Sequence, residues 1–257
     1  MKKDRIMPSV NQATKIPGKD EYKFNGEPIP IIGAPDDTDW QRWGMLNDRK
    51  SSRMYFFREG TDNQIYPFLL KDCSYQYDDT IPLLTIEGVD DDVNSSSMSM
   101  LSTPNFEPFK GVNGKDLPVP NNYHVYMQKR DNAQEVQQFI WEKDSENLER
   151  NGITRSEFAI KNFPGDTDWE RWAMTYDSNH YQLTLEAYVF FAFKSGSNTE
   201  IYYGRYGEKH TGKDGNEIDV YGYNGCLSLE GAPGNTNHSS MSMIFDGVDT
   251  HLFMLTK

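Results

Sequence analysis

Short runs of aromatic and β-branched residues recur along the chain, and Gly, Pro, Asn and Asp separate them roughly every ten residues. Clear examples lie at 53–57, 65–69, 188–193 and 201–203. Such runs between frequent turn residues predict β-strands rather than helices. The most helix-like stretch, 134–150, is charged, but its Val-Gln-Gln-Phe-Ile-Trp core has the composition of a strand. We therefore expect a strand followed by a loop there, and an all-β protein.

One block of sequence occurs four times. Residues 36–45 return without a gap at 165–174, and the shorter block 94–100 returns at 237–243. The two pairs also align with each other, so we number the repeats one to four in chain order. Repeats of this kind form their core from contacts between neighbouring units.

Three columns of the alignment predict how neighbouring units meet. The first holds Trp43, Met98, Trp172 and Met241, the second the small residues Gly44, Ser99, Ala173 and Ser242, and the third Met45, Met100, Met174 and Met243. In a strand, the first and third columns point to one face and the small column to the other. We expect large faces to meet small faces, with the flexible methionines buried in the joints.

An Asp or Asn precedes each of these strands, at Asp39, Asn94, Asp168 and Asn237. These residue types start turns, because their side chains accept hydrogen bonds from the backbone two residues further on. The same column could also form a ring of oxygen ligands for a hard cation such as Ca²⁺. Both interpretations are open on the sequence.

The spacing of the runs predicts about four strands per unit, which is the size of a propeller blade. The fourth unit is short, but its missing outer part is found near the N-terminus, where 22–26 matches 221–225. Pairing of this segment beside the C-terminal strands would remove an exposed edge. We predict a four-bladed β-propeller over residues 20–257, after an N-terminal extension over 1–19. The expected blades are 31–80, 81–152, 153–225, and 226–257 together with 20–30.

Asn162-Phe163-Pro164-Gly165 and the following Asp-Thr-Asp-Trp-Glu-Arg-Trp-Ala-Met resemble known families. The first phrase resembles the blade consensus of hemopexin-like four-bladed propellers. The second is more similar to the water-stress protein (WspA) family of terrestrial cyanobacteria, and this resemblance covers residues 20–257. It implies a place in an extracellular polysaccharide matrix and the glycosidase activity proposed for that family. The hemopexin likeness implies a cation in the central channel, held by backbone carbonyls near Trp43, Met98, Trp172 and Met241.

The net charge of the chain limits the kinds of partner that it can bind. The chain has 39 acidic and 26 basic residues and a net charge of −13, which argues against nucleic acid and anionic membranes. No run approaches the roughly 18 apolar residues of a membrane span, and the N-terminus lacks the apolar core of an ordinary signal peptide. The resemblance favours an extracellular setting, while the residues alone leave a cytoplasmic or particle-associated one open. The two cysteines, Cys73 and Cys226, are expected to be free thiols.

Candidate ligand-binding residues lie in the repeated blocks. Trp40 and Trp169 are three residues before Trp43 and Trp172, so each pair faces opposite sides of a strand. We expect Trp43 and Trp172 in the core and Trp40 and Trp169 at the surface, where sugars stack on indole rings. Arg42 and Arg171 are predicted to bridge neighbouring blades through Asp.

No catalytic motif accompanies these residues: the sequence has no nucleophile elbow, P-loop or metalloprotease motif. Two segments outside the repeat pattern, 103–122 and 207–219, are expected to be inserted loops. We therefore favour a non-enzymatic binding or scaffold protein, associated with polysaccharide. A glycoside hydrolase and a structural subunit of a bacterial or phage assembly are the alternatives.

Overall fold

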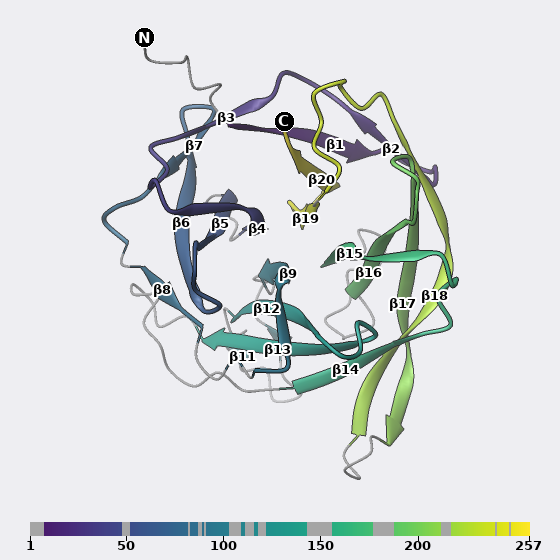
Figure 1. Cartoon of the computed structure of the whole chain (residues 1–257). Coiled ribbons are helices and arrows are strands. Elements are labelled where there is room, and N and C mark those ends of the chain that lie inside the picture. Colours follow the sequence, from purple (N-terminus) through teal and green to yellow (C-terminus); the bar gives the residue numbers. More distant parts are fainter. Residues whose placement is uncertain are drawn as a thin grey trace.

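The computed structural model describes an all-β protein, and no helix is present among its described residues. These are residues 8–47, 52–81, 83–86, 89, 91–102, 109–110, 116–117, 122–142, 156–176, 188–211, 217–239, 241–246 and 248–257. Accordingly, no helix long and apolar enough to cross a membrane occurs within these ranges. Figure 1 shows the strands arranged around a common centre.

Four antiparallel groups of strands each begin with a repeat strand. The first group is β4 (Thr38–Asn47), β5 (Ser52–Arg58), β6 (Gln64–Lys71) and β7 (Ser74–Tyr77), with the short β8 (Leu84–Thr85) beside β6. The second is β9 (Val93–Ser102), β12 (Asn122–Lys129), β13 (Glu135–Glu142) and β14 (Ser156–Lys161). The third is β15 (Thr167–Tyr176), β16 (Tyr188–Lys194), β17 (Glu200–Thr211) and β18 (Glu217–Glu230). The fourth is β19 (Ser242–Phe245), β20 (Thr250–Leu255), β1 (Ser9–Lys15) and β2 (Glu21–Phe24).

Parallel pairings at the outer strands join these groups. β14 pairs with β18, β18 pairs with β2, and β3 (Ile29–Ile32) pairs with β7. The result is one mixed 18-stranded system, beside which β10 (Phe109–Lys110) and β11 (Asp116–Leu117) form a separate pair. The outer strands thus have partners that a solitary four-stranded group would lack.

The first strands of the four groups lie innermost (Figure 1). β4 contacts β9, β9 contacts β15, β15 contacts β19, and β19 contacts β4. The four sequence repeats therefore meet in a cyclic order, in which the first repeat lies between the fourth and the second.

The two ends of the chain pair within the fourth group. β1 runs antiparallel to β20, with Val10 opposite Leu255 and Thr14 opposite His251. Pairing between the N-terminal and C-terminal segments is confirmed, but the residues differ from those predicted. The strand beside β20 lies in the segment we had assigned to the N-terminal extension, 1–19, and the predicted strand around 22–26 lies one position further out, beside β1. Val10 and Ala13 are the buried apolar residues of this strand, and its polar composition concealed it.

The repeat strands β4, β9 and β15 are each interrupted by three residues that have no partner across the ladder. Asp39 pairs with Phe57 and Trp43 with the adjacent Phe56, so 40–42 bulge out. The same shift separates Asp168 from Trp172 and Asn94 from Met98. In the fourth repeat, Thr236 lies opposite Thr256 and Ser242 opposite Phe253, which gives the same excess of three residues. Such a bulge redirects the side chains that follow it.

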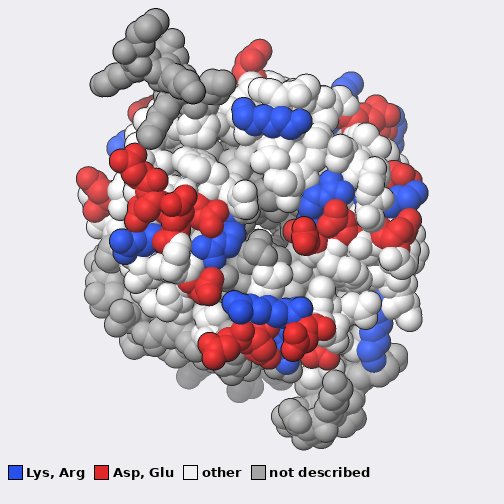
Figure 2. All heavy atoms as spheres, viewed as in Figure 1, with Lys and Arg blue, Asp and Glu red and all other residues white. Residues whose placement is uncertain are grey.

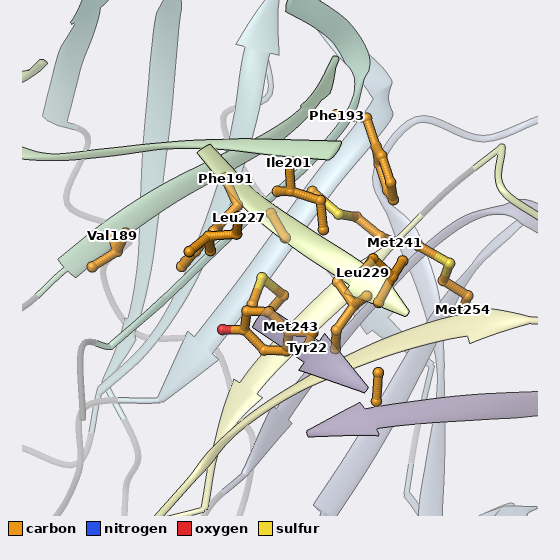
Figure 3. Close-up of a cluster of buried hydrophobic side chains, with 13 residues drawn as sticks. Tyr22, Val189, Phe191, Phe193, Ile201, Leu227, Leu229, Met241, Met243 and Met254 are labelled. Atoms are coloured by element: carbon orange, nitrogen blue, oxygen red, sulfur yellow. The ribbon is translucent and has the colours of Figure 1, made fainter. Parts of the chain in front are cut away.

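Four apolar clusters fill the joints between neighbouring repeats. The methionines at the third column position are each 0% exposed, which confirms the predicted burial: Met45, Met100, Met174 and Met243. Met100 lies in the cluster between repeats one and two, and Met174 in that between two and three. Figure 3 shows the cluster between repeats three and four, where Met243 lies near Tyr22 and Leu227. Met45 belongs to the fourth cluster, which includes Val10 of β1.

The small column allows close contact between the innermost strands. A Cβ at Gly44 would lie 2.8 Å from Cγ of Met100. In two of the joints a serine replaces this apolar contact with a hydrogen bond. The amide N–H of Met45 donates to Oγ of Ser242 at 2.9 Å, and that of Met174 donates to Oγ of Ser99 at 2.8 Å. These bonds satisfy the buried backbone N–H groups of Met45 and Met174.

The non-repeat segments give mixed outcomes. The strand predicted at the start of 134–150 is confirmed as β13, and 143–150 lie outside the described residues. Much of 207–219 is not a loop, because β17 and β18 continue their pairing as far as Thr211 and Glu217. Figure 1 shows this hairpin extending beyond the other strands. Within 103–122, the structure describes β10, β11 and the start of β12 at Asn122.

Candidate binding site

The Asp and Asn column forms turns in the three repeats whose contacts are described. Oδ1 of Asp39 accepts the amide N–H of Gln41 at 2.9 Å, and Oδ1 of Asp168 accepts that of Glu170 at 3.1 Å. Oδ1 of Asn237 accepts the N–H of Ser239 at 3.0 Å. The turn interpretation is therefore confirmed at these positions, and it explains how three unpaired residues can leave the ladder.

Arginines brace two of these turns. Nε of Arg42 donates to Oδ2 of Asp39 at 2.7 Å, and Nε of Arg171 donates to Oδ2 of Asp168 at the same distance. The guanidinium groups lie over Phe57 and Phe193, with centroid distances of 4.7 and 4.6 Å. Each ion pair thus fixes its own bulge rather than joining two repeats.

The links between repeats use other partners than we predicted. Arg171 reaches repeat four through the backbone carbonyl of His238, at 3.2 Å, and not through Asp168. Between repeats one and two, Asp62 is the shared group: Arg42 Nη1 lies 3.0 Å from its Oδ1 and Arg130 Nη2 lies 3.7 Å from its Oδ2. Bridging by Asp therefore occurs, but through Asp62, which lies outside the repeated block.

A wide pocket of about 790 Å³ lies among these turns. The first repeat supplies most of its wall, and the other three each reach it: the lining residues are Asp39, Gln41, Arg42, Gly60, Thr61, Asp62, Asn94, Arg130, Glu170 and Ser239. All of them are polar or glycine. We call this the turn-side pocket. Figure 2 shows a hollow at the centre of the face viewed in Figure 1, with acidic and basic side chains around it.

A pair of tyrosines supports the turns from beneath. Tyr66 donates its hydroxyl to Asp37 at 2.7 Å, and Tyr202 donates to Asp166 at 3.0 Å. Burial, followed by the hydrogen bond to the carboxylate, raises the pKa of each tyrosine to about 12. The bond from Tyr66, together with the guanidinium of Arg58, lowers the pKa of Asp37. These groups hold the turn positions and do not line the pocket.

The predicted side-chain cation site does not fit the observed contacts. Asp39 and Asp168 each accept a guanidinium N–H on one oxygen and a backbone N–H on the other, and Oδ1 of Asn237 accepts both the N–H and the hydroxyl of Ser239. A guanidinium 2.7 Å from a carboxylate repels a second cation there. Within the described ranges, no three His, Cys, Asp or Glu side chains are grouped to hold a metal. Asn94 lines the turn-side pocket, and its role toward a metal stays a prediction.

The tryptophans differ from prediction in one respect. Trp43 and Trp172 are each 2% exposed, which confirms their place in the core. Trp40 and Trp169 are not on the opposite side, because the bulge returns them to the same cluster. Trp40 and Trp43 both contact Phe56, with ring centroids at 4.9 and 6.0 Å. Trp169 packs against Phe163 and Phe190 in the same manner. Neither half-buried indole lines the turn-side pocket.

A second pocket, of about 340 Å³, lies at the opposite ends of the strands in the fourth group. It is formed by the β1–β2 turn, 15–20, and the β19–β20 turn, 248–250. Its wall comes from one group only. The turn-side pocket is larger and is built by every repeat, so it is the stronger candidate site. Cys73 and Cys226 are free, as predicted, and line neither pocket.

No protein-family model matches the chain, and no curated protein matches it. Sequence reasoning had singled out Asp39, Asn94 and Arg42 among the residues that line the turn-side pocket. It missed Asp62, Arg130 and the bulge residues Gln41, Glu170 and Ser239. These three bulge residues share one column of the repeat alignment, two positions after the turn-forming Asp or Asn. That shared position could have identified them from the sequence.

Proposed function

We propose that the protein is a non-enzymatic binding protein built as a hemopexin-like four-bladed β-propeller, and that its turn-side pocket binds a saccharide. The cyclic contacts among β4, β9, β15 and β19 and the four clusters between repeats support the propeller. The family resemblance of the repeated blocks, stated above, supports a polysaccharide-associated role. The single observation that carries the proposal is a pocket lined by all four repeats.

The chemistry of the pocket suits a polyhydroxylated ligand. Carboxylates accept hydrogen bonds, guanidinium groups donate them, and amide and hydroxyl side chains do both. Sugar hydroxyls likewise do both, so each can find a partner on this wall. A volume of about 790 Å³ lies within the range of small-ligand sites and admits several sugar units. Recognition here would rest on hydrogen bonds, because the described lining residues include no aromatic ring on which a sugar could stack.

The contacts favour binding over glycoside hydrolysis. A glycosidase needs one carboxyl that holds a proton for the leaving group. Two of the three carboxylates among the described lining residues, those of Asp39 and Asp62, are held by the guanidinium group of Arg42. We therefore assign them a structural and binding role. Turnover of a chromogenic galactoside that is lost on changing one of these carboxylates would contradict this assignment.

A glycan array followed by calorimetry tests the proposal. The intact protein should bind at least one oligosaccharide, and Gln41→Trp should reduce its affinity at least tenfold by filling the pocket. Gln41 is exposed at the bulge, so the variant should remain folded. Glu27→Trp is the matched control, since it adds the same ring to an exposed loop elsewhere and should bind as the parent does. Equal binding by both variants would refute the assigned pocket.

The central cation that the resemblance implies is a separate prediction. Native mass spectrometry before and after treatment with a chelator measures it directly. A mass loss equal to one divalent ion would support it, and an unchanged mass would refute it.

A further inference from the structure

Three acidic side chains line the turn-side pocket, and two of them are neutralised by arginine. Asp39 pairs with Arg42 at 2.7 Å, and Asp62 lies between Arg42 at 3.0 Å and Arg130 at 3.7 Å. The third, Glu170, has no ion pair and no side-chain hydrogen bond with any residue in the described part of the chain. It is exposed, and only its backbone N–H is engaged, by Asp168.

The charge of the pocket is therefore unbalanced at one place. The two guanidinium groups are matched by Asp39 and Asp62, so among the described lining residues the carboxylate of Glu170 is left without an opposite charge. The net charge of the whole chain, −13, attracts cations toward the surface as well. Both the local and the long-range field thus favour a ligand that carries positive charge.

Repeat one shows which residue occupies the position of Glu170 in another copy of the block. Glu170 in repeat three is equivalent to Gln41 in repeat one, and both line the pocket. In the cyclic order of the inner strands, β4 and β15 are separated by β9 on one side and by β19 on the other. The pocket therefore offers a neutral amide on one side and a carboxylate across from it.

We propose that the turn-side pocket selects a saccharide that bears a protonated amine, with Glu170 accepting the ammonium group. This rests on the proposed function, because it names the class of sugar for the same site. The hydroxyls of the ligand would bind the neutral donors and acceptors Gln41, Asn94 and Ser239. An N-acetylated sugar of the same length lacks the charge and binds more weakly.

Calorimetry on the full chain at mildly acidic pH and low salt tests the selection. The probes are a β-1,4-linked glucosamine tetramer and its fully N-acetylated counterpart. The parent protein should bind the amine form about fivefold more tightly, which is the upper range for one exposed charge pair. Raising the salt concentration should reduce the preference, since exposed charges are screened.

Two reciprocal variants exchange the residue types of repeats one and three at this position. Glu170→Gln gives repeat three the residue of repeat one, and it should abolish the preference while retaining binding of the acetylated form. Gln41→Glu adds the carboxylate on the other side and should increase the preference by a similar factor. Within the described ranges, neither side chain makes a hydrogen bond or ion pair that the change would remove, so both variants should unfold at the temperature of the parent.

The outcomes separate the two proposals. If neither tetramer binds, the amine selectivity is refuted, and the glycan array decides separately whether saccharide binding by the pocket stands. If both bind equally and Glu170→Gln changes nothing, saccharide binding stands and the selectivity is refuted. A preference that persists in Glu170→Gln also refutes the role of this carboxylate. If a tetralysine peptide binds more tightly than either sugar and needs Glu170, the ligand is a cationic protein segment and the sugar assignment is overturned.

Discussion

The turns around Arg42 in repeat one and Arg171 in repeat three have almost the same sequence. Both arginines pair with an Asp three residues earlier, and both lie over a Phe ring. Their outer nitrogens differ. Those of Arg171 bond to Asn198 and to the backbone carbonyls of Lys194, Ser197 and His238, and it is 9% exposed. Nη1 of Arg42 instead meets the charged, exposed Asp62 at the wall of the turn-side pocket.

The difference arises outside the repeated block. Asp62 and Asn198 occupy equivalent positions in the turn before the third strand of each group, and one is charged while the other is neutral. Asp62 can therefore hold both Arg42 and Arg130. Each arginine donates to one equivalent carbonyl, that of Arg58 or Lys194, but Arg171 also bonds to the carbonyls of Ser197 and His238. The same ten-residue block thus lines the charged wall of the turn-side pocket in repeat one, whereas in repeat three it forms a buried contact with repeat four.

The largest expected effect concerns the buried methionine that repeats one and three share. Met174→Asp and Met45→Asp each place an unpaired charge at a fully buried position, and we expect a loss of more than about 4 kcal/mol in each case. Both variants should therefore be unfolded by circular dichroism. Met174→Leu and Met45→Leu are the controls and should cost less than about 1.5 kcal/mol. A folded Met174→Asp protein would contradict the core assignment.

Replacing each arginine by alanine should lower the free energy of unfolding more in repeat three than in repeat one. Arg171→Ala should lower the free energy of unfolding by about 3 kcal/mol, because it removes the guanidinium partner of Asp168 and the donor to the carbonyls of Ser197 and His238. Arg42→Ala likewise removes the guanidinium partner of Asp39, but it should cost less, about 2 kcal/mol, because the exposed Asp62 keeps Arg130. Urea titrations of the two variants measure the difference. Equal losses would show that the contacts of Arg171 to repeat four contribute nothing to stability.

Loss of either serine hydrogen bond between inner strands should lower the free energy of unfolding by a similar amount. Ser99→Ala and Ser242→Ala each remove the acceptor of a buried amide, that of Met174 or of Met45. An unsatisfied buried amide costs about 1–3 kcal/mol, so both variants should lose a similar amount within that range. Thermal unfolding suffices to compare them. If one serine were dispensable, the two joints would differ in a way that the hydrogen bonds do not reveal.

The smallest effect concerns alkaline pH. The pKa of Tyr66 and that of Tyr202 are both about 12, above the ordinary value of 10.0. The stability that each contributes is fully present below pH 10 and is lost as the pH rises toward 12, because the unfolded chain releases the proton first. Tyr66→Phe and Tyr202→Phe should each flatten the decline of stability in this range. Unfolding midpoints measured from pH 9 to 11 would show it, and an unchanged slope would argue against the bonds to Asp37 and Asp166.

Columns of equivalent residues predicted burial well, because each was supported by four copies. The methionine column and the core tryptophans are confirmed for this reason. The placement of Trp40 and Trp169 was wrong because we assumed strict alternation. Residues 40–42 leave the ladder, and alternation cannot cross a three-residue bulge.

The pocket could not be predicted because its residues are distant in sequence. Asp62 and Arg130 lie outside the repeated blocks and meet only because repeats one and two are neighbours in space. Likewise, β1 has few apolar residues and finds its partner at the other end of the chain. Local patterns carry no information on such pairings until the order of the repeats around the centre is known.

The hydroxyl groups of Ser9 and Thr256 bond at 3.0 Å although 247 residues separate them in sequence. On the ribosome, β1 is made early, and its partner β20 emerges only after all of the intervening strands. The apolar side chains of β1 must remain without their final neighbours for that entire time, which gives other newly made chains an opportunity to capture them. Linking the two ends covalently and opening the chain at another turn would let these strands form as a local hairpin, and such a permuted protein should fold faster than the parent.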